Sequence, residues 1–178
     1  MDRNLILLIA AGALGIILLS LAMNQGLFPG TAPPAPADAE SQTDNPDAEQ
    51  AKAMVARALE YMDEHGTPSL IEKVNADAPE FHEGEFYVFV LDSAGTIVAH
   101  PIDPQWVGMD DQTGRDADGN AFLARMATAA ADSPDGSWFN YRWPNPVTKE
   151  VSNKSSWIVM RDSHVVGVGI YPEEEQEN

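Results

Sequence analysis

Lys154 and His100 are the two side chains of this sequence best suited to binding a small anion. Lys154 is one of only four lysines and lies among strand-forming residues. An ammonium in a partly dry pocket pairs strongly with a carboxylate, whereas a lysine on the solvated face of a strand has only a surface role. His100, which ends another apolar run, can donate to a carboxylate, titrate near neutral pH, or simply close a turn. Both residues are therefore candidate ligand contacts.

Three aromatic residues and one arginine are further candidates for lining the same pocket. Trp106, Tyr141 and Trp143 offer rigid contact area and a hydrogen-bonding edge, and they suit a hydrophobic core equally well. In an extended strand, Tyr141 and Trp143 share one face, while Arg142 lies on the other. Arg142 is the weaker cation candidate, because arginine on an exposed strand commonly only solvates the surface.

Motifs of common enzymes and metal sites are missing from the sequence. It contains no nucleophile elbow, phosphate loop, dinucleotide-binding fingerprint or His-Glu-x-x-His zinc motif. The absence of cysteine excludes disulfides and thiolate ligands. Residues 116–120 resemble the start of a calcium-binding loop, but Ala121 and Ala127 stand where such a loop needs glycine and glutamate. We therefore expect a binding protein and no enzyme, with neither metal nor cofactor.

The chain is strongly acidic. Its 28 acidic and 10 basic residues give a formal net charge of −18 at pH 7. This charge repels nucleic acids and anionic lipid headgroups, which excludes both as partners. An anionic ligand can bind such a protein only where a local cation overrides the surrounding negative potential.

The N-terminal segment predicts attachment to a membrane. Residues 4–23 carry no charge, and their length is close to the about 20 apolar residues of a transmembrane helix. A cleavable signal peptide is the alternative, although its apolar core is normally shorter. Residues 24–46, rich in proline, alanine and acidic residues, predict an extended linker. We expect a single-pass anchor at 1–23 in the inner membrane, a folded domain at 47–172 in the periplasm or outside the cell, and an acidic tail at 173–178.

Two helices are predicted at the start of the folded domain. Residues 47–65 place apolar side chains at helical spacing, with Asp44 or Asp47 as the N-terminal cap. A second, shorter helix is predicted at 69–76, with Ser69 as its cap. Both helices offer one apolar face for packing against the rest of the domain.

The remaining residues predict an antiparallel sheet interrupted by one helix, which is an α+β fold. Gly95 marks a tight turn between two adjacent strands. Residues 77–84 and 103–118 are predicted loops, and Asp118 is the predicted cap of a helix at 119–131. The predicted strands lie at 86–92, 96–101, 137–143, 151–160 and 165–171.

An ordered set of short motifs runs through the predicted domain: Phe86-Tyr-Val-Phe-Val-Leu-Asp92, Gly95-Thr-Ile-Val-Ala-His-Pro101, Gly108, Asp118-Gly119, Phe122, Trp138, Tyr141, Trp143-Pro-Asn-Pro146, Lys154-Ser-Ser-Trp157 and Gly167-Val-Gly-Ile-Tyr171. In order and spacing, the segment from Lys52 to Tyr171 resembles the single Cache domain, an extracytoplasmic sensor module of bacterial chemoreceptors and sensor kinases. The resemblance implies a PAS-like sheet of about five strands, a long N-terminal helix beside it, and a pocket for a small organic acid or amine.

Together, the residues and the resemblance predict a sensor domain that binds a short carboxylate. Lys154 would pair with the carboxylate, with Tyr141, Trp143 and His100 around it. Chemoreceptors continue into a second membrane helix and a signalling region, whereas only polar residues follow Tyr171 here. We therefore expect the domain to act through a partner protein in the membrane, as a monomer or as a homodimer along its long helix. The alternative is a ligand-free module that docks another envelope protein.

Overall fold

The computed structural model describes residues 45–172 of the chain. The predicted anchor, nearly all of the predicted linker and the acidic tail lie outside the described residues. Within 45–172, no helix combines the length and the apolar character needed to cross a membrane. The order of elements starts with two helices, continues with strands that are interrupted by one further helix, and ends in a β-hairpin.

The first helix, α1 (Pro46–His65), begins one residue before the predicted start. Its cap is Asn45, whose side chain accepts a hydrogen bond from the backbone N–H of Asp47 at 2.9 Å. Asp47, one of the two predicted caps, therefore lies inside the first turn, and Asp44 lies outside the described residues. The proline after the cap suits the first helical position, where no N–H is required.

The second helix, α2 (Thr67–Asn75), follows α1 after the single residue Gly66, whose φ of 85° turns the chain. α2 begins before the predicted cap, Ser69, and has no side-chain cap. The Ser69 hydroxyl instead contacts the hydroxyl of Tyr61 on α1 at 3.0 Å. The prediction of a cap at Ser69 is wrong, because this hydroxyl ties the two helices together.

Within residues 45–172, six antiparallel strands form one sheet, in the order β1-β2-β6-β5-β4, with β3 beside β2. The sheet has one strand more than predicted, because the two-residue strand β1 pairs with the start of β2 in a segment predicted as a loop. Gly95 lies in the turn between β2 and β3 with a φ of 89°, as the sequence predicted. The strands are β1 (His82–Glu83), β2 (Phe86–Asp92), β3 (Ile97–Ala99), β4 (Ser137–Pro144), β5 (Val151–Arg161) and β6 (His164–Ile170).

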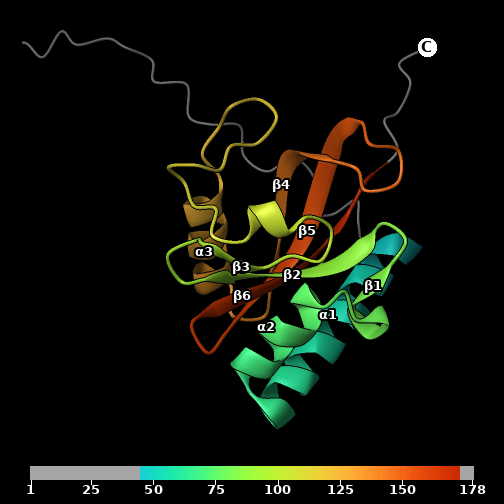
Figure 1. Ribbon diagram of the computed structural model, residues 1–178, viewed down its shortest axis with the longest axis vertical. Helices are drawn as coiled ribbons and strands as arrows, with labels where there is room; N and C mark the ends of the chain where they lie inside the picture. Colours follow the sequence, from blue (N-terminus) through green and yellow to red (C-terminus); the bar gives the residue numbers. More distant parts are fainter. Residues whose placement is uncertain (1–44, 173–178) are drawn as a thin grey trace, which may run out of the picture. The chain divides into compact units, whose positions relative to one another are not determined.

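One face of the sheet packs against α1 and α2 (Figure 1). Alternate residues of the strands point into this layer, including Val88 of β2 and Val166 and Val168 of β6, which are fully buried. The apolar side chains of α1, such as Met54 and Met62, are buried in the same layer. The sheet therefore covers the helix face that the sequence offered for dimer formation.

The other face of the sheet is covered by α3 (Leu123–Asp132) and by the loop of residues 100–122. α3 begins four residues after the predicted start. Its free N–H groups are satisfied by Asp111, whose Oδ1 accepts from the backbone N–H of Leu123 at 2.8 Å and of Ala124 at 3.2 Å. The prediction that Asp118 caps this helix is wrong, because its carboxylate pairs with Arg142. The predicted inner face of α3 is confirmed by the buried residues Phe122, Leu123, Met126, Ala127 and Ala130.

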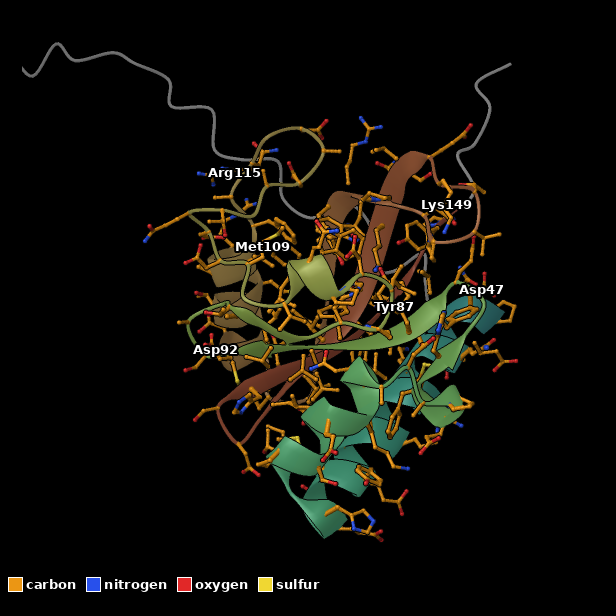
Figure 2. All side chains as sticks on the ribbon, in the orientation of Figure 1. Asp47, Tyr87, Asp92, Met109, Arg115 and Lys149 are labelled. Atoms are coloured by element: carbon orange, nitrogen blue, oxygen red, sulfur yellow. The ribbon has the colours of Figure 1, made fainter. Side chains whose placement is uncertain are left out.

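Backbone hydrogen bonds hold the loop of residues 100–122 at two places. Ile97 of β3 donates to the carbonyl of Met109 at 2.8 Å and accepts from the N–H of Gly108 at 2.7 Å. At the free edge of β4, the N–H of Ala117 donates to the carbonyl of Arg142 at 3.1 Å. Figure 2 shows the loop, with Met109 among its labelled residues, on the side of the sheet away from α1 and α2.

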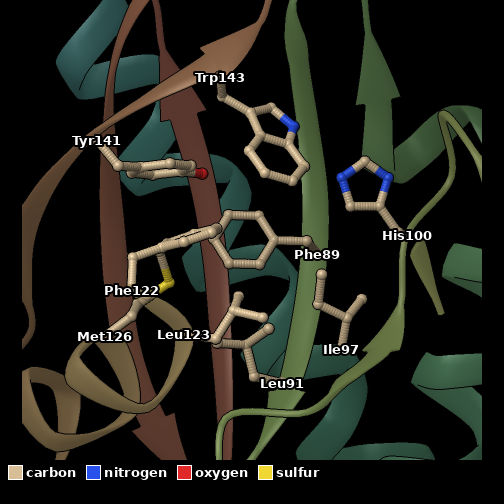
Figure 3. A pocket seen from close by; sticks show the side chains of 9 residues that line it. All are labelled: Phe89, Leu91, Ile97, His100, Phe122, Leu123, Met126, Tyr141 and Trp143. Atoms are coloured by element: carbon tan, nitrogen blue, oxygen red, sulfur yellow. The ribbon is translucent and has the colours of Figure 1, made fainter. Parts of the chain in front are cut away.

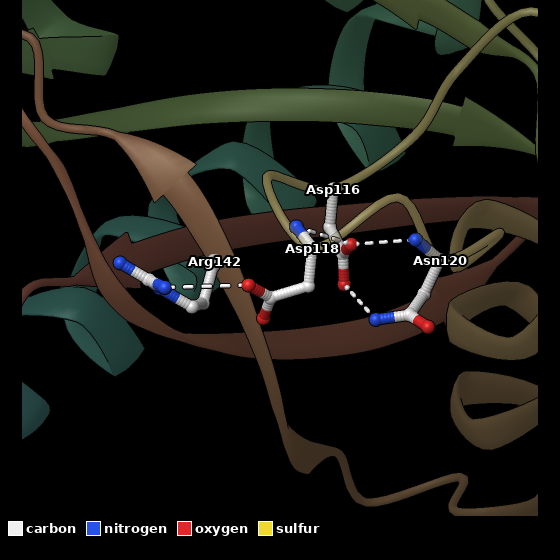
Figure 4. Close-up of polar contacts among 4 residues, drawn as sticks. All are labelled: Asp116, Asp118, Asn120 and Arg142. Atoms are coloured by element: carbon white, nitrogen blue, oxygen red, sulfur yellow. Dashed lines mark hydrogen bonds and ion pairs between the residues drawn. The ribbon is translucent and has the colours of Figure 1, made fainter.

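A polar turn stiffens the end of this loop (Figure 4). The carboxylate of Asp116 accepts from the backbone N–H groups of Asp118 at 3.0 Å and of Asn120 at 2.8 Å. Asp118 pairs with Arg142 at 3.2 Å on the surface. The acidic residues of this turn thus accept hydrogen bonds within the chain, as an Asx turn does.

Candidate functional site

Lys154 lies in the middle of β5, on the side of the sheet that faces α3. Its register partner on β4 is Tyr141, and Trp143 follows on the same face. Only 2% of Lys154 is exposed to solvent. A lysine is rarely buried to this extent without a partner for its charge, so its surroundings decide what it does.

The ammonium of Lys154 is enclosed by aromatic rings. Its Nζ donates a hydrogen bond to the hydroxyl of Tyr87 at 2.5 Å and lies 4.0 Å from the centre of the Tyr87 ring. The rings of Tyr171, Phe89 and Tyr141 follow at 5.2, 5.6 and 5.8 Å. Such rings attract a cation through their π faces but carry no full negative charge.

No carboxylate lies within ion-pair distance of Lys154 in the part of the chain that the structure describes. Burial therefore lowers the pKa of Lys154 well below its ordinary value of 10.5. An anion that reached Nζ would restore the charged form, because an opposite charge favours the ammonium. The site is thus arranged to gain from an anion supplied from outside.

A chain of hydroxyl groups leads away from Lys154. The ammonium can only donate to Tyr87, and the hydroxyl of Tyr171 donates to the carbonyl of Pro144 at 2.9 Å. In the long contact of 3.4 Å between the two hydroxyls, Tyr87 is therefore the donor and Tyr171 the acceptor. Burial raises the pKa of both tyrosines, so neither supplies a phenolate to the lysine.

His100 lies just beyond β3 and is 5% exposed. Its Nδ1 accepts a hydrogen bond from the backbone N–H of Ile102 at 3.3 Å, which assigns the proton of the neutral ring to Nε2. Burial, followed by the charge of Lys154 and then that of His82, lowers the pKa of His100 well below 6.5. The ring is therefore neutral near pH 7 and offers one N–H donor.

A cavity of about 20 Å³ lies on this face of the sheet, between β2, β4 and α3 (Figure 3). Lys154 borders it indirectly, because the rings of Phe89 and Tyr141 form part of its wall. The cavity has room for about one water molecule, so an organic ligand needs side chains or the loop to move. Its lining residues are Phe89, Leu91, Ile97, His100, Phe122, Leu123, Met126, Tyr141 and Trp143.

The structure brings five of the six predicted site residues together. Tyr141, Trp143 and His100 line the cavity. The Trp106 ring lies 4.5 Å from the His100 ring and 4.8 Å from the Trp143 ring, so it forms an outer layer of the same cluster. Lys154, the fifth member, lies beside Tyr141 as described above.

Arg142 is the predicted site residue that the structure places elsewhere. It lies on the opposite face of β4 from Tyr141 and Trp143, as strand alternation predicted. Its side chain is 42% exposed and pairs with Asp118 (Figure 4). This exposed pair links the loop to β4. Lys154 is therefore the only predicted cation in the site, and it is the only buried lysine or arginine among residues 45–172.

Tyr87 and Tyr171 are the site residues that sequence reasoning missed. Strand alternation puts Tyr87 on the same face as Phe89 and Leu91, but its residue type and position favour packing over ligand contact. The two tyrosines are 84 residues apart in the chain and meet only because β2 and β6 are paired. Their position beside Lys154 follows from the register between β2 and β6. Composition and periodicity do not determine this register.

Acidic residues and histidines do not gather into a metal site. In the described part of the chain, no group of three or more His, Asp or Glu side chains could hold a metal ion. The polar groups that line the cavity are a tyrosine, an indole and a neutral histidine, and a buried lysine with two further tyrosines lies beside them. All of these groups can donate hydrogen bonds. This donor set suits an anion with acceptor oxygens.

Comparison with protein families and curated proteins gives three matches. The family model described as single Cache domain 2 matches residues 38–177, which is most of the chain. The methyl-accepting chemotaxis protein McpP of Pseudomonas putida is 30% identical over 97 residues, or 53% of this chain. The sensor histidine kinase MctS of Rhizobium johnstonii is 34% identical over 88 residues, or 48% of this chain. Each match covers only 18% of the curated relative.

Solved structures share the fold at lower sequence identity. A methyl-accepting chemotaxis protein from Vibrio parahaemolyticus has a TM-score of 0.58 at 21% identity, over 70% of this chain and 88% of that one. A Cache chemosensory domain, described for its carboxylic acid recognition, has a TM-score of 0.53 at 20% identity, over 70% of this chain and 88% of that one. The periplasmic sensor domain of a chemotaxis protein has a TM-score of 0.53 at 22% identity, over 70% of this chain and 90% of that one.

Proposed function

The chain belongs to the single Cache domain family, and we propose that it is the ligand-binding domain of an extracytoplasmic signalling system. Similarity to a chemotaxis receptor and to a sensor kinase supports this role. The folded domain would stand outside the cytoplasmic membrane, held by the apolar N-terminal segment. It would pass its signal to a membrane partner, because Cache domains of receptors are signalling domains without catalysis.

A short monocarboxylate is the ligand class that the site supports best. The observation that carries this assignment is the buried ammonium of Lys154, which has no carboxylate partner among residues 45–172. A buried charge without a counter-charge costs free energy, and a ligand carboxylate would recover it. The related Cache domain described for carboxylic acid recognition supports the same class.

The donors around the cavity would hold the two carboxylate oxygens. Lys154 would supply the charge, and the hydroxyl of Tyr141 and the Nε2–H of His100 would donate hydrogen bonds. The apolar tail of the ligand would lie against Ile97 and Leu123, which line the other end of the cavity. With a single buried cation in the described site, the second carboxylate of a dicarboxylate would remain unpaired, which favours monocarboxylates.

Ligand entry would require movement, and this movement would be the signal. A cavity of about 20 Å³ is too small for propionate, so α3 or the loop of residues 100–122 would have to shift outward. A ligand that binds only the opened form shifts the population towards that form. The partner would then read the changed position of the loop or of α3.

A thermal-shift screen of the full chain in detergent tests the proposal. We expect acetate or propionate to raise the melting temperature in a concentration-dependent manner, because only ligands that prefer the native state stabilise it. Succinate and ethylamine are the comparison ligands and should give much smaller shifts. A stabilisation by ethylamine but by neither monocarboxylate would overturn the assignment.

The matched variants of this screen are Lys154→Ala and Lys149→Asn. Both remove one positive charge, but Lys149 is exposed and its φ of 65° suits asparagine. The shift with propionate should disappear in Lys154→Ala and persist in Lys149→Asn. Equal loss in both variants would point to general electrostatics.

The second candidate function is a ligand-free module that docks another envelope protein. The small cavity favours it, because aromatic side chains already fill most of the site. Silence of the whole ligand panel in the thermal-shift screen, together with an undisturbed fold, would support this alternative over ligand binding.

A further inference from the structure

The side chain of Lys154 crosses a neighbouring strand to reach its hydrogen-bond partner. Lys154 is on β5 and Tyr87 is on β2, and β6 lies between these two strands. Gly169 of β6 pairs with Ser156 of β5. Since Val168 pairs with Val88, the same register places Tyr87 opposite Gly169. The lysine therefore passes over β6 at this glycine.

Space, and not backbone conformation, explains the glycine at position 169. Gly169 is absent from the glycines with positive φ, so its backbone would accept any L-residue. A Cβ at this position, however, would lie 2.0 Å from Cε of Lys154 and 2.8 Å from Oγ of Ser156. Glycine inside a strand weakens it and commonly marks the close approach of another group. Here that group is the stem of the buried lysine.

A second glycine on the same strand serves as the internal comparison. A Cβ on Gly167 would lie 2.4 Å from Cζ of Phe89, and none of its three nearest atoms belongs to Lys154. Gly167 and Gly169 thus leave room for two different side chains on the same face of β6. A methyl group at position 169 should displace the stem of Lys154 directly, whereas a methyl group at position 167 should displace the ring of Phe89 first.

We propose that Gly169 is a positioning residue of the ligand site. Because it has no side chain, it leaves a gap over β6, and this gap fixes where the Lys154 ammonium would meet a ligand carboxylate. The ligand part of this inference rests on the function proposed above. The lysine stem is flexible, so a side chain at position 169 would push it aside and leave the chain folded. Nζ would then lose the hydroxyl of Tyr87 and leave its place among the aromatic rings.

A double-mutant cycle on the full chain tests the gap without any ligand. We expect Gly169→Ala to lower the melting temperature by several degrees in the wild-type background and much less in a Lys154→Ala background, where the nearest clashing atom, Cε of Lys154, is gone and only Oγ of Ser156 remains close. Gly167→Ala should lower it equally in both backgrounds. An equal loss for Gly169→Ala in both backgrounds would overturn the inference. If Gly169→Ala does not fold, recovery of folding by Lys154→Ala supports it and failure to recover contradicts it.

The position of the ammonium is read out by NMR of protein with ¹³C-labelled lysine side chains. We expect Gly169→Ala to move the Cε signal of Lys154, assigned by its loss in Lys154→Ala, and to change its titration. Gly167→Ala should change both much less, since its methyl group meets Phe89, whose ring centre lies 5.6 Å from Nζ, and none of its nearest contacts is an atom of the lysine stem. An unchanged Lys154 signal in Gly169→Ala would contradict a positioning role.

Binding of propionate separates this inference from the proposed function. Gly169→Ala should weaken propionate at least tenfold if the wild-type chain binds it. If the double-mutant cycle shows coupling between positions 169 and 154 but the wild-type chain binds no carboxylate, the positioning role stands and the proposed ligand is rejected. If propionate binding depends on Lys154 but Gly169→Ala leaves the affinity unchanged, the inference about Gly169 is rejected and the proposed function stands.

Discussion

The protonation state of Lys154 decides how the site responds to a ligand. Burial lowers the pKa of Lys154 well below 10.5, so the free site favours the neutral amine more than an exposed lysine does. A bound carboxylate would favour the ammonium and raise the pKa again. Binding therefore takes up a proton at any pH between the pKa values of the free and the bound protein.

The first prediction is that the affinity for propionate falls as the pH rises above the lowered pKa of Lys154. The ligand stays ionised above about pH 6, so the change reports on the protein. Calorimetry in buffers of different ionisation enthalpy measures the proton taken up. Lys154→Ala should show neither effect, and a wild-type affinity that is constant up to about pH 9 without proton uptake would contradict the prediction.

The second prediction concerns His100 and the stability of the free protein. Burial, aided by the charges of Lys154 and His82, lowers the pKa of His100 well below 6.5. The unfolded chain therefore binds more protons than the folded chain once the pH drops below 6.5. Stability from this group is complete above that pH and is lost as the pH falls towards the lowered pKa.

His100→Asn isolates this contribution, because the asparagine Oδ1 can still accept from the N–H of Ile102 but cannot titrate. We expect the free energy of unfolding in urea to fall less between about pH 7 and 5 in the variant than in the wild type. Carboxylates that titrate in the same range affect both proteins alike. Equal losses in the two proteins would show that His100 is not the buried base described here.

At the scale of the elements, one carboxylate connects the site loop to α3. Asp111 accepts from the first two N–H groups of the helix, and the helix supplies Leu123 and Met126 to the cavity. A displacement of the loop therefore changes the start of α3 as well. Through this coupling, a ligand bound between loop, helix and sheet would alter the surface offered to the proposed partner.

The third prediction is that Asp111→Ala destabilises the full chain by about 1 kcal/mol, the usual effect of losing a helix cap. Asp118→Ala is the matched control, since it removes the same charge from an exposed ion pair and should cost about 0.5 kcal/mol or less. Urea unfolding measures both. A larger effect at Asp118 than at Asp111 would mean that the ion pair, and not the cap, holds this region.

The fold was predictable where the information is local, and the site only where it depends on strand alternation. Alternation placed Tyr141 and Trp143 on one face of β4 and Arg142 on the other. The cap of α3 was missed because Asp111 and Leu123 are 12 residues apart. The partner of Lys154 was missed because Tyr87 is 67 residues away. The first contact depends on the path of a loop and the second on the register of strands distant in the chain, and sequence periodicity encodes neither.

On the scale of the whole described domain, the two faces of the sheet have different properties. The core of the layer with α1 and α2 is built from apolar side chains and holds no buried charge. The layer with α3 holds Lys154 and His100 beneath a long loop. In a protein of net charge −18, this second layer is where we propose that an anion finds a local cation.

The proposed function depends on the buried ammonium of Lys154, which we propose binds the carboxylate of a small ligand. The most direct measurement is the affinity of propionate for the full chain by titration calorimetry, compared with Lys154→Ala and Lys149→Asn. Loss of a buried charge partner costs about 2 kcal/mol or more, so we predict at least about thirtyfold weaker binding for Lys154→Ala. Lys149→Asn should bind like the wild type. Equal affinities for the wild type and Lys154→Ala would contradict the claim.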